Sequence, residues 1–154
     1  MTIDIVPYDK KYAKSFYDLN IEWLKSYFYV EPYDEIVLKN PEDFIIDKGG
    51  IIFFALQNSK VVGTVALMAF DRNGTYELTK MAVSTQYRGQ KIGQRLMQYC
   101  IEFSRNKGID KLVLYSNTRL KNAIYIYKKY GFKEVVLEPD SPYKRSNIKM
   151  ELYL

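Results

Sequence analysis

The sequence predicts an α+β (α/β) domain with a mixed, mostly antiparallel central sheet flanked by helices. Three observations lead to this class. Strand-like segments joined by tight turns follow one another in the middle of the chain, a strand–helix–strand unit comes next, and two short strands close it. The 154 residues suit one domain of ordinary size, so we expect residues 1–154 to form a single domain.

The first part of the chain predicts a short strand followed by two helical stretches. Ile3 to Pro7 reads as the strand, and Asp9 is placed to cap the helix that follows. Apolar residues recur there at helical spacing: Tyr12, Phe16, Leu19, Trp23 and Tyr27. The second helical stretch covers about 32–46 and is interrupted at Pro41.

Three antiparallel strands are expected next, over 51–57, 61–70 and 76–83. A tight turn at Asn58-Ser59 joins the first two. Asn73-Gly74 predicts the hairpin between the second and third strands, because both residues accept positive φ.

The last part of the chain alternates helices with strands. The expected helices cover 88–106 and 120–130, and the expected strands cover 112–116, 132–137 and 148–154. Gly108 and Gly131 supply the helix ends, the second of them in a Schellman cap. The strand–helix–strand unit around the first of these helices should be a right-handed crossover between parallel strands.

The composition excludes several classes of site. The chain has no histidine and one cysteine, Cys100, so a Cys/His metal site, a histidine base and an internal disulfide are excluded. The net charge of +5 suits an anionic ligand, whereas no Lys/Arg run is long enough to favour nucleic acid. No apolar run is long enough to span a membrane and no leader pattern is visible, so a cytoplasmic protein is expected.

Residues 88–93, Arg-Gly-Gln-Lys-Ile-Gly, form the first candidate site, between a strand end and the first turn of a helix. Free N–H groups at a helix start bind anions, and Gly89 and Gly93 allow close approach to the backbone. Arg88 and Lys91 add positive charge, so a pyrophosphate is the natural ligand. The alternative is a helix start with two glycines that serve packing. The glycine spacing matches neither a dinucleotide-binding nor a P-loop pattern.

The segment from Met81 to Gly93 resembles the signature of the GCN5-related N-acetyltransferases, the GNAT family, which reads Arg/Gln-x-x-Gly-x-Gly/Ala after a strand. Lys91 stands where the family usually has glycine. If that position needs positive φ, a lysine there costs roughly 1–2 kcal/mol. Either the loop avoids positive φ, or Lys91 adds a phosphate contact in compensation.

The resemblance continues through the second half of the chain. Residues 123–132 are similar to the family's late helix, and a Ser-Asn pair precedes them at a distance three residues longer than usual. Either Asn117 or Asn122 therefore takes the asparagine role at the cofactor. Segments 19–24 and 141–151 resemble a branch in which some members are fused behind a MarR-type DNA-binding domain. This chain begins at the acetyltransferase's first strand, so no such domain is expected in it.

The resemblance implies direct acetyl transfer from acetyl-CoA to an amine, in a ternary complex and without a metal. Two parallel strands splay apart in this family, and the pantetheine arm pairs with the exposed backbone of one of them, where the Met81 N–H can stabilise the oxyanion. The cofactor-binding residues implied are Met81, Ala82, Val83, Arg88, Gly89, Gln90, Lys91, Ile92, Gly93, Asn117, Asn122 and Tyr127.

Two residues match catalytic positions of the family. Glu77 precedes Met81 by four residues on one strand, so both side chains are expected on one face, and Glu77 is the candidate base, directly or through water. The alternative is an edge carboxylate that serves solubility. Tyr127 is the candidate acid for the leaving thiolate, with core packing as its alternative.

The acceptor is not readable from these residues: an amino acid, a polyamine, an antibiotic amine and a peptide N-terminus all remain. The aromatic residues Trp23, Tyr27, Phe28 and Tyr29 read mostly as core, and part of this cluster is expected to line the acceptor pocket together with Glu31, Asp34, Glu35, Tyr143 and Arg145. A non-catalytic acyl-CoA sensor is the second functional class. A nucleic-acid-binding domain is the third, weakened by the absence of a helix dense in Arg and Lys. The oligomeric state is open, with a homodimer as one option.

Overall fold

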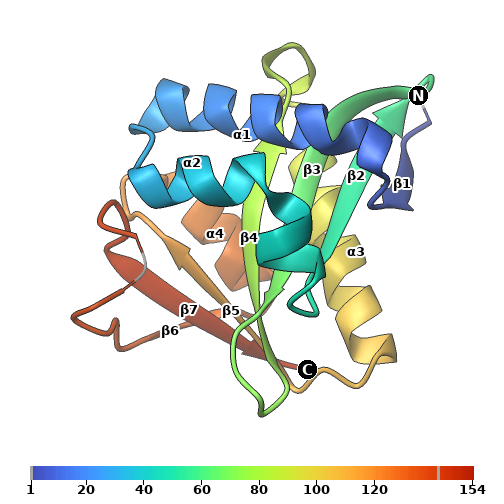
Figure 1. Cartoon of the computed structure of the whole chain (residues 1–154). Helices are drawn as coiled ribbons and strands as arrows, with labels where there is room; N and C mark the ends of the chain where they lie inside the picture. The colour runs from blue at the N-terminus through green and yellow to red at the C-terminus, as the bar shows by residue number, and fades with distance from the viewer. Residues whose placement is uncertain (1, 142) are drawn as a thin grey trace.

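A computed structural model describes residues 2–141 and 143–154 of the chain (Figure 1). Pro142, within the closing segment singled out above, lies outside these residues. The sheet has seven strands in the order β1-β2-β3-β4-β5-β7-β6. The strands are β1 (Asp4–Pro7), β2 (Ile51–Gln57), β3 (Lys60–Ala69), β4 (Thr75–Val83), β5 (Lys111–Ser116), β6 (Lys133–Val135) and β7 (Ile148–Tyr153). The helices are α1 (Ala13–Tyr27), α2 (Pro32–Lys39), α3 (Ile92–Asn106) and α4 (Lys121–Lys129).

Helices cover both faces of the sheet, with α1 and α2 on one face and α3 and α4 on the other (Figure 1). Each face buries its own apolar cluster, because successive side chains of a strand point to opposite faces. In β2, Phe53 joins the cluster under α3 and Phe54 joins the cluster under α1 and α2. The β4–β5 pair is parallel and the other neighbouring pairs are antiparallel, which confirms the predicted mixed sheet.

The helix ends follow the predicted signals. The Asp9 side chain accepts a hydrogen bond from the Lys11 N–H at 3.0 Å, in the short helical turn that leads into α1. At the end of α4, the Phe132 N–H donates to the Tyr127 carbonyl and the Gly131 N–H donates to the Lys128 carbonyl, both at 3.0 Å. With Gly131 at φ +101°, this is the predicted Schellman cap.

The start of one helix and the backbone of one hairpin differ from the predictions. The helix expected from Arg88 begins at Ile92, because Gly89 and Lys91 adopt positive φ and interrupt helical geometry. The hairpin at 73–74 forms, but only Gly74 has positive φ. Asp71 organises that loop, since its carboxylate accepts hydrogen bonds from the N–H groups of Asn73 at 2.8 Å and Thr75 at 3.2 Å.

A β-bulge in β4 changes which side chains share a face. Thr64 of β3 pairs with Ala82 and Ala66 pairs with Thr79, so Lys80 and Met81 together face a single β3 residue. Lys80 adopts φ +57° there. The neighbours of Glu77 in β4 and the side chain of Met81 all pack in the cluster under α3, so Glu77 points to the α2 face. The prediction that Glu77 and Met81 share a face is therefore wrong.

The two parallel strands separate soon after they meet. Pairing between β4 and β5 covers only Thr75–Glu77 against Lys111–Val113. Beyond it, β4 stays with β3 and β5 continues with β7 as far as Ser116. The predicted splay is thus confirmed, and it leaves one edge of β4 without a strand partner from Leu78 onward.

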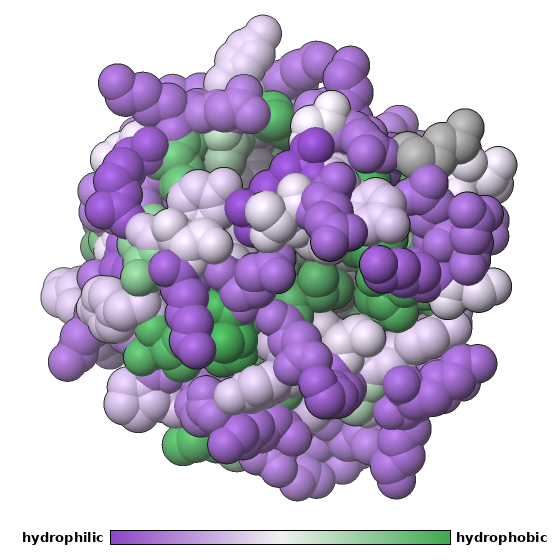
Figure 2. All heavy atoms as spheres, turned by 90° about the horizontal axis from the view of Figure 1, so that it is seen from above, coloured by the Kyte–Doolittle hydropathy of each residue, from purple (hydrophilic) through white to green (hydrophobic). Residues whose placement is uncertain are grey.

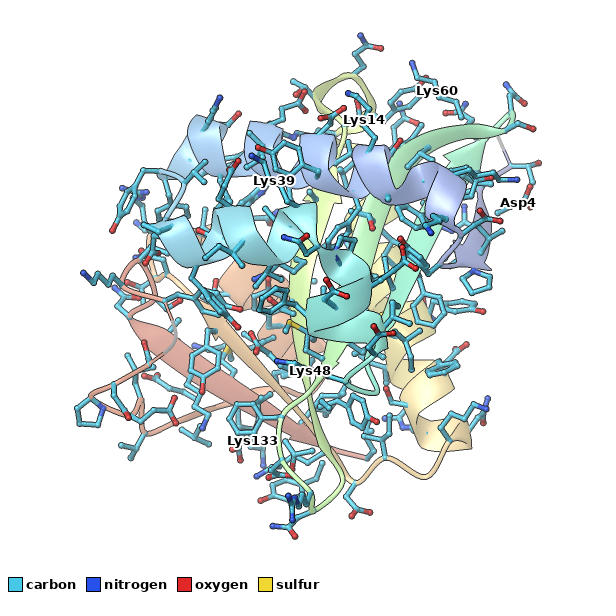
Figure 3. All side chains as sticks on the ribbon, viewed as in Figure 1. Asp4, Lys14, Lys39, Lys48, Lys60 and Lys133 are labelled. Carbon is cyan, nitrogen blue, oxygen red and sulfur yellow. The ribbon has the colours of Figure 1, made fainter. Side chains whose placement is uncertain are left out.

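Exposed lysines occur on several parts of the surface. Lys14, Lys39, Lys48, Lys60 and Lys133 lie on different elements and are all exposed (Figure 3). Polar side chains cover most of the face seen from above, with apolar groups visible between them (Figure 2). Within the described ranges, no helix combines the length and apolar character needed to cross a bilayer.

Candidate active site

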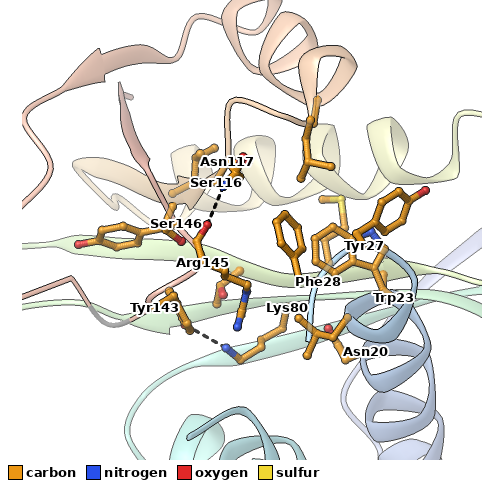
Figure 4. Close-up of a pocket in the computed structure, with 18 of the residues that line it drawn as sticks. Asn20, Trp23, Tyr27, Phe28, Lys80, Ser116, Asn117, Tyr143, Arg145 and Ser146 are labelled. Carbon is orange, nitrogen blue, oxygen red and sulfur yellow. Dashed lines mark hydrogen bonds between the residues drawn. The ribbon is translucent and has the colours of Figure 1, made fainter. Parts of the chain in front are cut away.

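A pocket of about 310 Å³ lies where β4 and β5 separate (Figure 4). Its walls come from the C-terminal half of α1, the residues of β4 after the last β5 pair, the end of β5, α4 and the loop before β7. The pocket therefore passes between the two layers of helices. We call its wall toward α3 and α4 the α3 side, and its wall toward α1 and α2 the α2 side.

The start of α3 forms a turn beside the pocket, with the backbone geometry of a candidate anion site. Lys91 caps the helix in the left-handed conformation, at φ +61° and ψ +22°. The Arg95 N–H donates to the Lys91 carbonyl at 3.1 Å, so the N–H groups before it stand at the open helix end. The loop therefore does not avoid positive φ. At this φ a lysine is strained by roughly 1–2 kcal/mol, whereas a glycine would not be.

The predicted cofactor residues divide into two groups. Six line the pocket: Met81, Ala82, Val83, Arg88, Asn117 and Tyr127. The others lie outside its lining. Gly89, Gln90 and Lys91 are exposed on the turn, Gly93 is partly buried, and Ile92 is 1% exposed and offers only its backbone. Asn122 is exposed in the first turn of α4.

Arg88 lines the pocket and carries an unsatisfied donor. Its guanidinium lies 5.3 Å from the Tyr27 ring centroid, and its Nη2 atom is buried without a hydrogen-bond partner among the described residues. An unpaired buried donor of a charged group is costly, and a phosphate oxygen would satisfy it. The turn and Arg88 together therefore fit a pyrophosphate.

Asn117 holds the loops at the end of β5. Its amide nitrogen donates to the Arg145 carbonyl at 2.8 Å, and its side-chain oxygen accepts from the Arg119 N–H at 2.8 Å. Asn117 thus ties the end of β5 to the closing loop and keeps one further amide N–H for another partner.

Tyr127 lies between the apolar core and the pocket. The ring packs edge-on against Phe132 with centroids 6.1 Å apart, and it also lines the pocket. Burial raises the pKa of the Tyr127 phenol, and the Ser116 hydroxyl opposes this rise. The phenol is therefore protonated at neutral pH and can act as a donor.

Glu77 is buried in an interior strand, which excludes the reading of an edge carboxylate. It is 7% exposed, and its Oε2 atom has no hydrogen-bond partner among the described residues. Burial raises the pKa of the Glu77 carboxyl, while the charge of Lys80 and the hydroxyls of Thr79 and Tyr143 oppose the rise. Glu77 does not line the pocket itself, but Leu78 and Thr79, which follow it in β4, do, so Glu77 stands just behind the pocket wall.

Lys80 is a pocket residue that the sequence analysis missed. It is 9% exposed, and its Nζ donates to the Tyr143 hydroxyl at 2.9 Å. Burial lowers the pKa of the Lys80 ammonium, and the charges of Glu77 and Asp34 oppose this. A lysine between Thr79 and Met81 gives no sequence signal for burial, because the bulge that turns it inward is not visible in the strand pattern.

An ion cluster completes the α2 side. The two Nη atoms of Arg145 donate to the Asp34 carboxylate, at 2.7 and 3.0 Å, and Nη1 also donates to Glu31 at 2.8 Å. Glu31 and Asp34 sit at the start of α2, in a capping box. Both carboxylates are buried, so Arg145 fixes the closing loop to α2.

The acceptor-pocket residues predicted from sequence are only partly brought together. Those that line the pocket are Trp23, Tyr27, Phe28, Asp34, Tyr143 and Arg145. Glu31 lies behind Arg145. Glu35 bonds to Tyr17 at 2.7 Å and to Lys39 at 2.9 Å, and Tyr29 is 54% exposed, so neither lines the pocket. The reading of this aromatic cluster as core is also wrong, because none of its four residues is fully buried.

Other reactive groups lie away from the pocket. Burial raises the pKa of the Cys100 thiol inside the cluster under α3, which fits a packing role. In the part of the chain that the structure describes, no three His, Cys, Asp or Glu residues come together in a metal-binding arrangement.

Comparison with known proteins identifies relatives of this chain. The sequence profile of the acetyltransferase (GNAT) family matches residues 13–132. N-alpha-acetyltransferase 30 of Schizosaccharomyces pombe is 28% identical over 133 residues, which cover 84% of this chain and 83% of that protein. N-acetyltransferase 8B of Homo sapiens is 28% identical over 97 residues, and the match covers 60% of this chain and 43% of that protein. The chain thus spans less than half of the human relative.

Solved structures agree with this result. An acetyltransferase of the GNAT family from Staphylococcus aureus Mu50 superposes with a TM-score of 0.86 at 25% identity, over 99% of both chains. The PaiA N-acetyltransferase from Thermoplasma acidophilum, in complex with coenzyme A, superposes with a TM-score of 0.77 at 20% identity, over 100% of both chains. At that identity the second likeness supports the fold alone.

Proposed function

The chain belongs to the acetyltransferase (GNAT) family, and from this premise we propose that it moves an acetyl group from acetyl-CoA to a primary amine by direct attack in a ternary complex. The predicted N-acetyltransferase class and acetyl-CoA as cosubstrate are confirmed at the level of the family. The observation that carries the proposal is the pocket at the β4–β5 separation, with an anion-binding turn next to it.

The α3 side is proposed as the cofactor site. The free N–H groups at the start of α3 bind the pyrophosphate, with Arg88 and Lys91 as cationic partners. The unpaired edge of β4 at Met81, Ala82 and Val83 binds the pantetheine arm as a strand partner would. Gly89, Gln90, Ile92 and Gly93 contribute backbone, and Asn117 and Asn122 remain the two candidates for the asparagine contact.

The chemistry is proposed for the centre of the pocket. An alkylammonium, with a pKa near ~10.4, must lose a proton before it attacks the thioester. Glu77 accepts this proton, through water or directly, and its burial favours proton binding. The Met81 N–H stabilises the negative charge that develops on the thioester oxygen. Tyr127 donates its proton to the departing thiolate.

Several wider expectations also belong to the proposal. We propose one acetyltransferase domain over residues 1–154, related to the branch in which some members are fused to MarR-type regulators. We also propose a cytoplasmic protein that acts on a small-molecule or peptide amine and binds neither membranes nor nucleic acid. Fractionation of tagged protein tests the location, and light scattering tests the option of a homodimer.

A thiol-release assay tests the reaction. Purified protein with acetyl-CoA and a library of amines should release free coenzyme A with at least one amine, and calorimetry should detect coenzyme A binding. Binding without release for every amine would favour an acyl-CoA sensor, and no binding would remove the assignment.

Substitution Tyr127→Phe tests the proposed acid. Turnover should fall by about 100-fold or more, because general acid catalysis contributes this much. Coenzyme A affinity should change little, since the ring and its packing against Phe132 stay. Unchanged turnover would remove Tyr127 from the mechanism.

A further inference from the structure

The α2 side of the pocket contains a polar cluster that is incomplete without a ligand. Lys80 and Tyr143 line this side and Glu77 lies beside them, just behind the wall, and each of the three is at most 9% exposed. A protonated lysine has three donors, and Lys80 uses one of them, toward the neutral Tyr143 hydroxyl. Figure 4 shows the Lys80 side chain extending across the pocket toward Tyr143.

No carboxylate among the described residues lies within ion-pair distance of Lys80. Its neighbour Asp34 is already bound by Arg145 and by the Glu31 N–H at 2.9 Å. Glu77 shows the converse gap, because its Oε2 atom lacks a donor in the described chain. The cluster thus presents unused donors on Lys80 and an unused acceptor on Glu77.

Burial makes both gaps costly. A buried ammonium with one neutral partner and a buried carboxyl oxygen with none are unfavourable in the absence of a counter-charge. Burial accordingly disfavours the charged form of both groups: it lowers the pKa of Lys80 and raises the pKa of Glu77. A ligand that carries an anion for Lys80 and a proton donor for Glu77 would complete the cluster.

We infer that the acceptor is an amine that bears a carboxylate close to its nitrogen, as in an α-amino acid, and that Lys80 binds this carboxylate. This inference rests on the proposed function and names its substrate class. The ammonium of such an acceptor passes its proton to Glu77, which lies just behind the pocket wall, and the carboxylate accepts hydrogen bonds from Lys80. A polyamine would bring a second cation toward Lys80, so polyamines are poor acceptors.

The chain offers a matched control for Lys80. Lys149 of β7 is 8% exposed and donates to Glu138 at 2.9 Å, but it does not line the pocket. Lys80→Met and Lys149→Met therefore each remove one buried ammonium, and only the first removes it from the pocket. Coenzyme A calorimetry and thermal melting show that each variant is folded.

The experiment compares amino acids with the amines left when their carboxylate is removed: phenylalanine with phenethylamine, leucine with isoamylamine, and lysine with cadaverine. For the natural protein, kcat/KM should favour at least one amino acid by about tenfold or more, the effect of one charge-assisted hydrogen bond. In Lys80→Met the ratio of kcat/KM for the amino acid to kcat/KM for its decarboxylated amine should fall to about one, mainly because KM for the amino acid rises. In Lys149→Met it should persist.

Two results overturn the inference alone: amines are acetylated without preference for the carboxylate, or the preference survives in Lys80→Met. If no amine of either kind releases coenzyme A, the proposed function fails and the inference fails with it. Calorimetric titration of the preferred amino acid into the complex with coenzyme A gives a readout besides activity, and its affinity should fall about tenfold in Lys80→Met.

Discussion

The two sides of the central pocket are built in different ways. On the α3 side, the proposed cofactor surface consists of nearly consecutive residues, the β4 edge at 81–83 and the turn at 88–91 next to the pocket, and it presents mostly backbone groups. The α2 side consists of side chains from α1, α2, β4 and the closing loop. Ion pairs hold it together: Arg145 binds Glu31 and Asp34, which precede it in the chain by 114 and 111 positions. The first depends on local conformation, and the second depends on the whole fold. Substitutions on the two sides should therefore have different consequences.

The largest effect is expected on the α2 side, for Arg145→Met. Removing the guanidinium leaves Glu31 and Asp34 buried without a counter-charge, which should lower the free energy of unfolding by about 3–5 kcal/mol. Urea denaturation measures this change. The control is Lys39→Met, which removes a cation from the exposed ion pair with Glu35 and should leave stability almost unchanged.

The same variant tests whether the two sides are independent. Coenzyme A affinity of the folded protein should be unaffected by Arg145→Met, because the proposed cofactor site is formed by other elements. A loss of affinity in proportion to the loss of stability would show that the closing loop also shapes the α3 side.

Glu77→Gln should have the next largest effect, on turnover. Without the proposed base, kcat should fall by about 100-fold, the usual contribution of a general base. In the natural protein the acidic limb of the rate profile should lie above pH 4.5, the usual carboxyl pKa, because burial raises the pKa of Glu77. Glu134→Gln, on exposed β6, is the control.

Glu77→Gln should raise the free energy of unfolding, although it lowers turnover. With its pKa raised in the folded state, the carboxyl contributes stability at low pH, and this contribution is lost as pH rises through the folded pKa. The glutamine variant does not titrate, so its advantage in unfolding free energy over the natural protein should grow from about pH 4.5 upward. If the variant is less stable than the natural protein at neutral pH, burial is not the cause of the raised pKa of Glu77.

Arg88→Met should have an intermediate effect, confined to the α3 side. Because its Nη2 atom is buried and unpaired among the described residues, we expect coenzyme A affinity to fall by about tenfold, with kcat at saturation nearly constant. Calorimetry measures the affinity. Arg105→Met, near the exposed end of α3, should bind coenzyme A as the natural protein does.

The same contrast explains which parts of the molecule were predictable from sequence. Strand order in the meander, the crossover, the Schellman cap at Gly131 and the turn at 88–93 each follow from residues close together in the chain. The burial of Lys80 does not, because the bulge beside it is decided by how β4 pairs with β3. The separation of Glu77 from Met81 has the same cause. The pairing of Asp34 with Arg145 depends on where the closing loop returns, which no local pattern records.

Lys91→Gly should have the smallest effect, and it separates strain from function at one position. Lys91 adopts φ +61°, where a lysine is strained and glycine is not. Relief of this strain, reduced by the greater freedom of glycine in the unfolded chain, should raise the free energy of unfolding by about 1 kcal/mol or less. If Lys91 also contacts the pyrophosphate, coenzyme A affinity should fall several-fold in the same variant, and more at low salt than at high salt. A variant that is more stable and binds equally well would show that the lysine is only tolerated there. A variant that is more stable and binds less well would show that the lysine is held in an unfavourable backbone conformation for its charge.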